Sequence, residues 1–325
     1  MHDAAHGHAA HGRAVVAFAL GAAVLFGITS PAAKVLLADA APLVLAGLLY
    51  LGAGAGLSAW WILRRVLHGP GAPAAALRAR DLPALAGAVL FGGVLGPALQ
   101  MAGLRVTPAS TASLLLNLET VWTSLIAWIV VREHVDRRLA GGLALVVAGG
   151  VVLCAPGAAP GAPPWGALAI AGACLAWGVD NNVTRGLAER DPVQVAAIKG
   201  LAAGAFTLVA GLATGGAWPA GRIVLGAAAL GVTGYGASLV LFVLALRHLG
   251  TGRTAAWFAL GPFLGAAVAV LVLGEPPTAG MLGAGALMAA GAALLLGERH
   301  EHAHRHGDLV HSHPHYPDAE HRHDH

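Results

Sequence analysis

The residues best placed to do chemistry are polar side chains that interrupt long apolar runs. Glu119 lies near the middle of one such run, within Leu116-Asn117-Leu118-Glu119-Thr120. A carboxylate in apolar surroundings needs a partner, a water-filled cavity or a bound proton. We therefore predict that Glu119 is a substrate or proton site. The alternative is a neutral or paired glutamate with a structural role only.

A second polar cluster runs from Asp180 to Arg185 and reads Asp-Asn-Asn-Val-Thr-Arg. Its consecutive polar positions cannot all share one face of a helix. We expect Asp180, Asn181 and Thr184 to look into a cavity, and Asn182 to bond a neighbouring helix. The alternative is a polar helix end at which Asp180 balances Arg185.

The third candidate is Lys199, about two helical turns after Pro192. It could pair with Glu119 or Asp180, bind an anionic substrate, or extend along the helix to reach the membrane surface. Other apolar runs contain further hydrogen-bonding candidates: Gln100, Asn117, Tyr50 and Tyr235.

The elements that position these residues are long apolar segments. Of the 325 residues, 57% are hydrophobic and 11% are charged, against about 25% charged in soluble domains. The lipid bilayer is therefore the expected partner, and a net charge of +3 suggests no nucleic-acid partner. We predict an all-α integral membrane protein whose ten transmembrane helices lie at about 14–36, 42–63, 82–104, 109–131, 139–155, 165–186, 192–214, 222–245, 252–273 and 278–296.

The chain repeats itself. The segment 104–153 aligns without a gap with 246–295, so that Leu104-Arg105 matches Leu246-Arg247 and Glu133 matches Glu275. Five helices in each copy force the second copy to be inverted in the membrane relative to the first. The copies differ where Glu119 and Asn117 are replaced by Gly261 and Ala259, and where Pro262 stands in place of Thr120. We predict that function lies at such differences.

These patterns divide the chain into five parts. We predict a His-rich N-terminal tail (1–13), a first five-helix repeat (14–155), a linker (156–164), a second repeat (165–297) and a His-rich C-terminal tail (298–325). With both termini in the cytoplasm, only Lys34, Arg105 and Arg222 are basic residues on the outer side. This asymmetry predicts cytoplasmic termini in a multi-pass protein of the inner (plasma) membrane.

Most histidines lie in the two tails, at alternating or nearby positions. Imidazole binds Ni²⁺, Zn²⁺, Co²⁺ and Cu²⁺, so the tails are candidate sites for a divalent metal, although no cofactor is required. A solvated tail without a metal role is the alternative. The C-terminal candidates are His300, His302, His304, His306, His311, His313, His315, His321, His323 and His325.

Several activities are disfavoured. The chain has no Gly-Lys-Ser/Thr sequence for ATP binding, no His-Glu-x-x-His and no Gly-x-Ser-x-Gly. We therefore predict that it is not an enzyme. Gly-xxx-Gly spacings such as Gly200/Gly204 favour close helix packing and leave homodimer formation open.

The chain resembles the EamA branch of the drug/metabolite transporter superfamily over about 14–297. The resemblance rests on ten spans in two inverted halves, on the aromatic-Gly pairs Phe26-Gly27 and Trp177-Gly178, and on Glu133 and Glu275 after the fourth helix of each half. It implies a secondary transporter with a central cavity between the halves. By that implication the residues to examine are Gln100, Asn117, Glu119, Asp180, Asn181 and Tyr235.

The leading hypothesis is thus a secondary transporter that exports a small metabolite, amino acid or drug-like compound by alternating access. Proton exchange at Glu119 would couple the transport, unless transport is uncoupled. A divalent-metal exporter or metal-regulated transporter that uses the tails is the second hypothesis. A non-transporting membrane scaffold, which would have no cavity, is the third.

Overall fold

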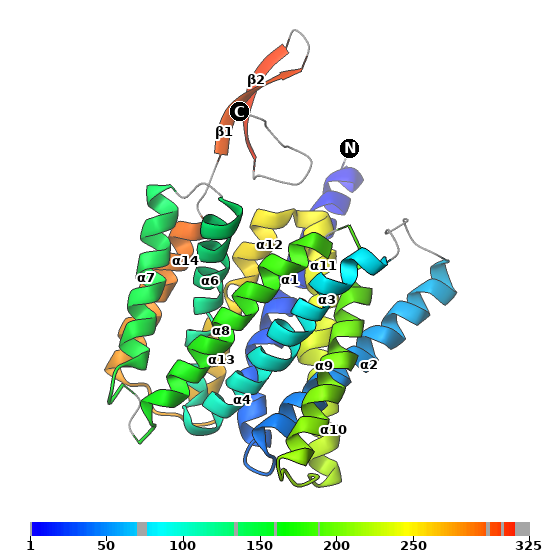
Figure 1. Cartoon of the computed structure of the whole chain (residues 1–325). Coiled ribbons are helices and arrows are strands. Elements are labelled where there is room, and N and C mark those ends of the chain that lie inside the picture. The colour runs from blue at the N-terminus through cyan, green and yellow to red at the C-terminus, as the bar shows by residue number, and fades with distance from the viewer. Residues whose placement is uncertain are drawn as a thin grey trace.

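The computed structural model describes residues 2–69, 77–132, 136–158, 161–187, 189–296, 300–306 and 309–315. Over these ranges the chain is a bundle of helices with one small hairpin (Figure 1). The helices of the first half are α1 (His2–Leu36), α2 (Pro42–His68), η1 (Ala79–Asp81), α3 (Leu82–Gly87), η2 (Ala88–Leu95), α4 (Gly96–Val106), α5 (Ala109–Leu115), α6 (Leu118–Ile126), η3 (Ala127–Val131) and α7 (Arg137–Cys154). Those of the second half are α8 (Pro164–Thr184), η4 (Arg185–Leu187), α9 (Pro192–Ala213), α10 (Gly221–Leu230), η5 (Gly231–Ala237), α11 (Ser238–Leu249), α12 (Thr251–Phe258), α13 (Gly261–Leu271) and α14 (Ala279–Leu296).

These elements form ten rods that match the ten predicted spans. Within the described residues, nine helical stretches are long and apolar enough to cross a membrane. The tenth rod, α8, has 21 residues, but its Asp180-Asn181-Asn182 run lowers its hydropathy below that of the others. A bilayer-spanning helix needs about 20 residues, so α8 is long enough to cross as well.

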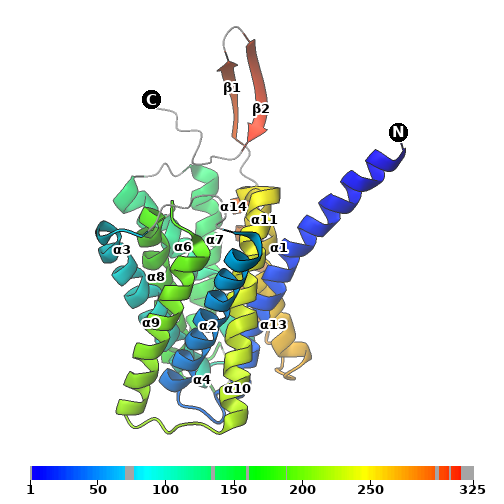
Figure 2. The same ribbon diagram turned by 90° about the vertical axis from the view of Figure 1, so that its right-hand side faces the viewer.

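The described parts of both tails have regular secondary structure. The helix α1 begins at His2, so residues 2–13 are helical and lead into the first candidate span, which begins at Val16. At the other end, β1 (His300–His306) and β2 (Leu309–His315) pair as an antiparallel hairpin beyond α14. The start of α1 and the hairpin lie at the same end of the bundle (Figures 1 and 2). We call this the terminal end, and the opposite one the far end.

Contacts between the halves occur in symmetric pairs, as an inverted repeat requires. The second helix of each half packs on its counterpart, α2 on α9, and so does the fifth, α7 on α14. The first helix of each half contacts the third and fourth helices of the other: α1 packs on α11 and α13, and α8 packs on α4 and α6. The predicted inverted architecture is confirmed.

Small residues allow this close packing. At Gly204 of α9, an added Cβ would lie 2.6 Å from the backbone nitrogen of Leu51 in α2, which no real side chain tolerates. In a bilayer helices gain little from hiding apolar surface from water, so close backbone approach supplies much of their attraction. The Gly200/Gly204 spacing thus serves packing between the two halves of one chain.

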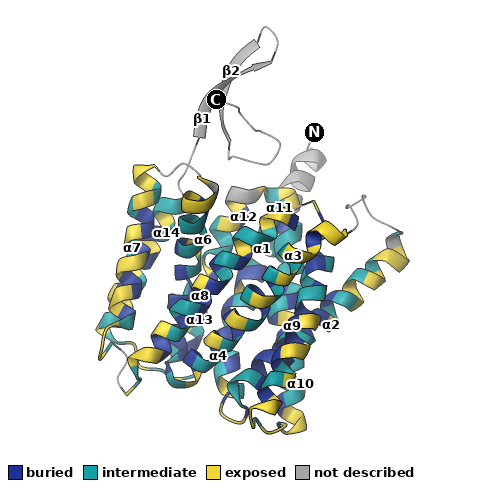
Figure 3. Ribbon diagram, viewed as in Figure 1, coloured by how far each residue is buried: buried dark blue, intermediate teal, exposed yellow. Residues whose placement is uncertain are grey.

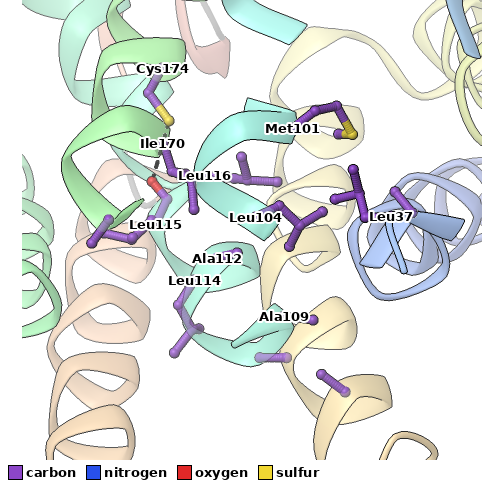
Figure 4. Close-up of a cluster of buried hydrophobic side chains, with 14 of the residues drawn as sticks. Leu37, Met101, Leu104, Ala109, Ala112, Leu114, Leu115, Leu116, Ile170 and Cys174 are labelled. Carbon is purple, nitrogen blue, oxygen red and sulfur yellow. Dashed lines mark hydrogen bonds between the residues drawn. The ribbon is translucent and has the colours of Figure 1, made fainter. Parts of the chain in front are cut away.

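Burial follows the environment expected in a bilayer. The largest buried cluster combines side chains from both halves, among them Met101, Leu104, Leu115 and Ile170 (Figure 4). Exposed residues lie along the outer flanks of the bundle (Figure 3). Many of them are large and apolar, such as Leu271, which is 82% exposed. Apolar surface on this scale is expected to contact lipid.

Irregular stretches interrupt the third and fourth helices of both halves. The third contains the π-helical segments η2 and η5. The fourth breaks at Leu116-Asn117 in the first half and at Ala259-Leu260 in the second. Pro262 explains the second break, because proline lacks an N–H and clashes with the preceding turn. In the first half, Cys174 donates to the Leu115 carbonyl at 3.4 Å (Figure 4) and Asn117 Nδ2 donates to the Leu114 carbonyl at 2.8 Å.

Candidate substrate site

A cavity of about 580 Å³ lies between the two halves. Its wall extends from mid-bundle, at Ser30 and Gln100, to the terminal end, where α14 stops at Leu296. This volume is typical of small-molecule sites. All seven predicted site residues line the cavity: Gln100, Asn117, Glu119, Asp180, Asn181, Lys199 and Tyr235.

Lys199 and Asp180 form an ion pair in the cavity wall. Lys199 Nζ lies 2.7 Å from Asp180 Oδ2, and Thr184 donates to Asp180 Oδ1 at 3.0 Å. Among the roles left open for Lys199, the structure shows pairing with Asp180. Both carboxylate oxygens therefore have partners, as buried charge requires.

Glu119 is held by an amide from the other half. Asn181 Nδ2 donates to Glu119 Oε1 at 2.9 Å and to Thr123 Oγ1 at 3.1 Å. Asn182, the next residue of α8, donates to the Thr123 carbonyl at 3.0 Å. In the polar run of α8, Asp180 and Asn181 line the cavity, and Asn182 bonds the neighbouring α6. Thr184, which was expected to look into the cavity, is not among its described lining residues. Thr184 supports Asp180 from the following turn.

The remaining predicted residues occupy the deeper part of the cavity. Tyr235 of η5 donates to Gln100 Oε1 over a long 3.5 Å, and Gln100 Nε2 donates to Ser30 at 3.3 Å. The amide of Asn117 bonds its own helix at the break in the fourth helix and also lies 3.9 Å from the Met288 sulfur. The main hydrogen bond of the Asn117 amide nitrogen is therefore to the Leu114 carbonyl at the helix break.

At the far end, two charged residues hold the turn between α4 and α5. Lys34 donates to the carbonyls of Leu104, Arg105 and Thr107 at 2.7, 3.0 and 2.9 Å. The carboxylate of Glu275, from the second half, accepts the N–H groups at the start of α5, from Ala109 at 2.6 Å and from Ser110 at 2.8 Å. Each charge complements the dipole of its helix end.

Comparisons with known proteins agree with this geometry. The chain matches the EamA-like transporter family over residues 13–155 and again over 164–297. The chain belongs to the EamA-like transporter family. An "Uncharacterized transporter" of Methanothermobacter thermautotrophicus is 26% identical over 271 residues, which cover 78% of each protein. A solved structure titled "Crystal structure of protein" has a similar fold, with a TM-score of 0.62 and 23% identity over 87% of this chain and 95% of that one.

Membership of this family establishes a multi-pass membrane protein of a transporter family, not an enzyme family. The two family matches coincide with the two predicted repeats. Glu275 is the glutamate that the internal repeat aligns with Glu133, and it accepts the N–H groups at the start of α5. Its counterpart Glu133 lies outside the described residues, as do His321, His323 and His325.

The carbonyl of Gly92, in η2, was not identified in the sequence analysis of this EamA-like transporter as a hydrogen-bond acceptor in the site. Tyr50 OH and Trp177 Nε1 both donate to it, at 2.9 and 3.1 Å. A π-helical turn disrupts the regular α-helical bonding, and such turns are frequent at functional sites. An added Cβ at Gly92 would also lie only 1.9 Å from Asp180 Oδ2. The only signal in the sequence was the Gly92-Gly93 pair within an apolar helix.

Proposed function

We propose that this protein is a secondary active transporter that exports a small molecule from the cytoplasm by alternating access. The observation that carries the proposal is a cavity between two inverted halves that reaches the terminal end and has a few polar groups in an apolar wall. At the far end, Glu275 bonds one half to the other. Transporters built from inverted repeats bind substrate near the midplane and rock one half against the other. The bias of basic residues supports cytoplasmic termini in the inner (plasma) membrane, which makes the cavity inward-facing.

Glu275 supplies the link between the halves that must open during transport. It lies after α13 in the second half, whereas the amides that it binds belong to α5 in the first half. An outward-facing state requires these bonds to break. The scaffold hypothesis, in contrast, predicts no cavity, whereas the described residues enclose one.

The test is a thermal-shift screen of the purified protein followed by flux measurements. Amino acids, nucleosides, organic amines and divalent metals are added separately, and a ligand that binds the folded state raises its melting temperature. Each compound that raises it is then loaded, radiolabelled, into proteoliposomes for counterflow. Exchange that depends on the protein supports the proposal. A ligand that binds without any exchange would contradict it.

Glu119→Gln is expected to abolish the response of transport to a pH gradient. The carboxylate lines the cavity with an amide as its hydrogen-bond partner, so it can bind a proton or substrate in turn, whereas glutamine cannot bind a proton. Counterflow of a screened ligand is measured with and without the gradient. Thr123→Ser, which keeps the neighbouring hydroxyl, is the matched control. An unchanged pH response in Glu119→Gln would rule out proton coupling at this residue.

The hairpin favours a secondary role for metal. Its register pairs His300 with His315, His302 with His313, and His304 with His311. Alternate positions of a strand share one face, so the backbone brings these six positions together. We propose that Ni²⁺, Zn²⁺, Co²⁺ or Cu²⁺ binds here and regulates transport, or is itself exported.

Removal of residues 300–325 is expected to weaken binding of these metals by the detergent-purified protein and to lower cellular metal tolerance. Titration calorimetry with Ni²⁺ and Zn²⁺ measures the first effect, and growth on metal-containing medium the second. In a second variant, the histidines of residues 300–325 are replaced with glutamine in the full-length chain. This variant distinguishes the effect of losing the imidazole groups from the effect of shortening the chain. Unaltered binding and tolerance in both variants would show that the tail has no metal role.

A further inference from the structure

Along the described part of the cavity wall, two carboxyl groups are accompanied by one amino group. Among its described lining residues, only Glu119, Asp180 and Lys199 are charged. Asp180 and Lys199 cancel one another at 2.7 Å. Glu119 is bonded by the uncharged amide of Asn181 through Oε1, and Oε2 forms no hydrogen bond within the described part of the chain. With all three groups ionised, the site therefore has a net charge of −1.

The Asp180–Lys199 pair acts as a neutral unit because the Asp180 side chain cannot turn away. Asp180 is 4% exposed, and each of its oxygens has a partner, Thr184 on one and Lys199 on the other. Its carboxylate also lies directly against the backbone of Gly92. A substrate carboxylate that took Lys199 would leave Asp180 as a buried, unpaired charge, which is strongly unfavourable.

Apart from Lys199, donors for an anion are scarce, because the N–H groups of Asn181 and Trp177 are already used. Asn181 uses its amide nitrogen on Glu119 and Thr123. The single indole N–H of Trp177 is used on the Gly92 carbonyl. A substrate anion would thus meet the repulsion of Glu119 without a compensating set of free donors.

The rest of the wall suits an organic cation. Phe258 lies between Phe26 and Phe242, with ring centroids 5.1 and 4.8 Å away. The rings of Tyr50 and Tyr235 are 5.5 Å apart on the same cavity. Aromatic faces attract cations, most strongly where water is excluded, and they also accept the apolar body of a ligand.

We infer that the substrate is a small organic monocation, a protonated amine with an aromatic or aliphatic body, whose ammonium group binds Glu119. This inference rests on the proposed transport function and names its substrate class. A monocation neutralises the site, whereas a zwitterion leaves the charge of −1 in place and an anion raises it to −2.

The test is a series of ligands that share one body and differ in charge. Binding of 2-phenylethylamine (cation), phenylalanine (zwitterion) and 3-phenylpropionate (anion) to the detergent-purified full-length protein is measured by calorimetry at neutral pH. The amine is expected to bind at least about ten-fold more tightly than the other two, the scale of one lost charge interaction. Glu119→Gln should remove this preference, and Glu119→Asp should retain it. Asp39→Asn, which neutralises an exposed carboxylate at the far end, should have no effect.

Each outcome decides the assignment. Tighter binding of phenylalanine or phenylpropionate, an amine affinity unchanged in Glu119→Gln, or no binding of any of the three overturns the monocation assignment. Counterflow in proteoliposomes separates this failure from failure of transport. If phenylalanine binds best and is exchanged, transport stands and the charge class is wrong. If the amine binds through Glu119 without being exchanged, the charge class stands and the transport function fails.

Discussion

Glu275→Ala is expected to shift the protein towards a state that is open at the far end. The variant loses two charge-assisted hydrogen bonds, from the N–H groups of Ala109 and Ser110 at 2.6 and 2.8 Å. Bonds of this kind contribute about 2–3 kcal/mol together in a part-buried setting. That free energy corresponds to a change of roughly 30- to 150-fold in the equilibrium between the two states.

Spin-label distances across the far end measure this shift. Ala38 of the first half and Pro277 of the second are both exposed. Spin labels are therefore attached at Ala38→Cys and Pro277→Cys, in a Cys154→Ala background. In Glu275→Ala, a larger fraction of molecules should show the longer distance between the two spin labels. Asp39→Asn provides the control, because it breaks only the exposed Arg222–Asp39 pair at the same end, and such pairs contribute about 0–1 kcal/mol. Equal distance distributions in Glu275→Ala and the parent would contradict the role of Glu275 in closing the far end.

Among glycine-to-alanine substitutions in the cavity wall, Gly92→Ala is expected to destabilise the protein most. The new Cβ would lie 1.9 Å from Asp180 Oδ2, so the carboxylate must leave and Lys199 loses its partner. Overpacking costs about 1–3 kcal/mol, and breaking a buried pair costs about 3–5 kcal/mol. Lys199 is partly exposed, so water reduces the second figure. We expect a large fall in the yield of folded protein and in its melting temperature in detergent.

Two comparisons make this result specific. Gly283→Ala should be silent, because nothing lies within 4 Å of its added Cβ. In an Asp180→Ala/Lys199→Ala background, Gly92→Ala should lower the melting temperature much less than in the parent, because the displaced pair is absent. A double-mutant cycle of this kind isolates the coupling between the groups. If Gly92→Ala is equally harmful in both backgrounds, its effect does not pass through the ion pair.

The overall architecture could be predicted because it depends on patterns within single segments. The predicted span 192–214 agrees with α9 at Pro192–Ala213, and the predicted span 109–131 agrees with α5 to η3. Apolar length sets the spans, and the repeat sets their inverted relation. The bilayer leaves little choice, since each backbone N–H and C=O must be bonded inside its own helix.

The pairing of the polar residues depended on geometry that the sequence does not express. Lys199 had two candidate carboxylates, and the packing of both α9 and α8 on η2 places it beside Asp180. Glu119 was predicted from its cost in an apolar setting, but Asn181 as its partner required the contact between α6 and α8. The helical conformation of residues 2–13 was not predicted, because their histidines and glycines lack an apolar helical pattern.

The low hydropathy of α8 has a consequence for how the protein is made. A helix that carries Asp180 near its end, with two asparagines beside it, partitions from the translocon into lipid less readily than its neighbours do. The groups that satisfy Asn181 and Asn182 are on α6, which is synthesised earlier, whereas Lys199 on α9 emerges later. Stable insertion of α8 therefore depends on an assembled first half and is completed only when α9 arrives. The residues that line the cavity therefore also affect how stably α8 inserts into the membrane.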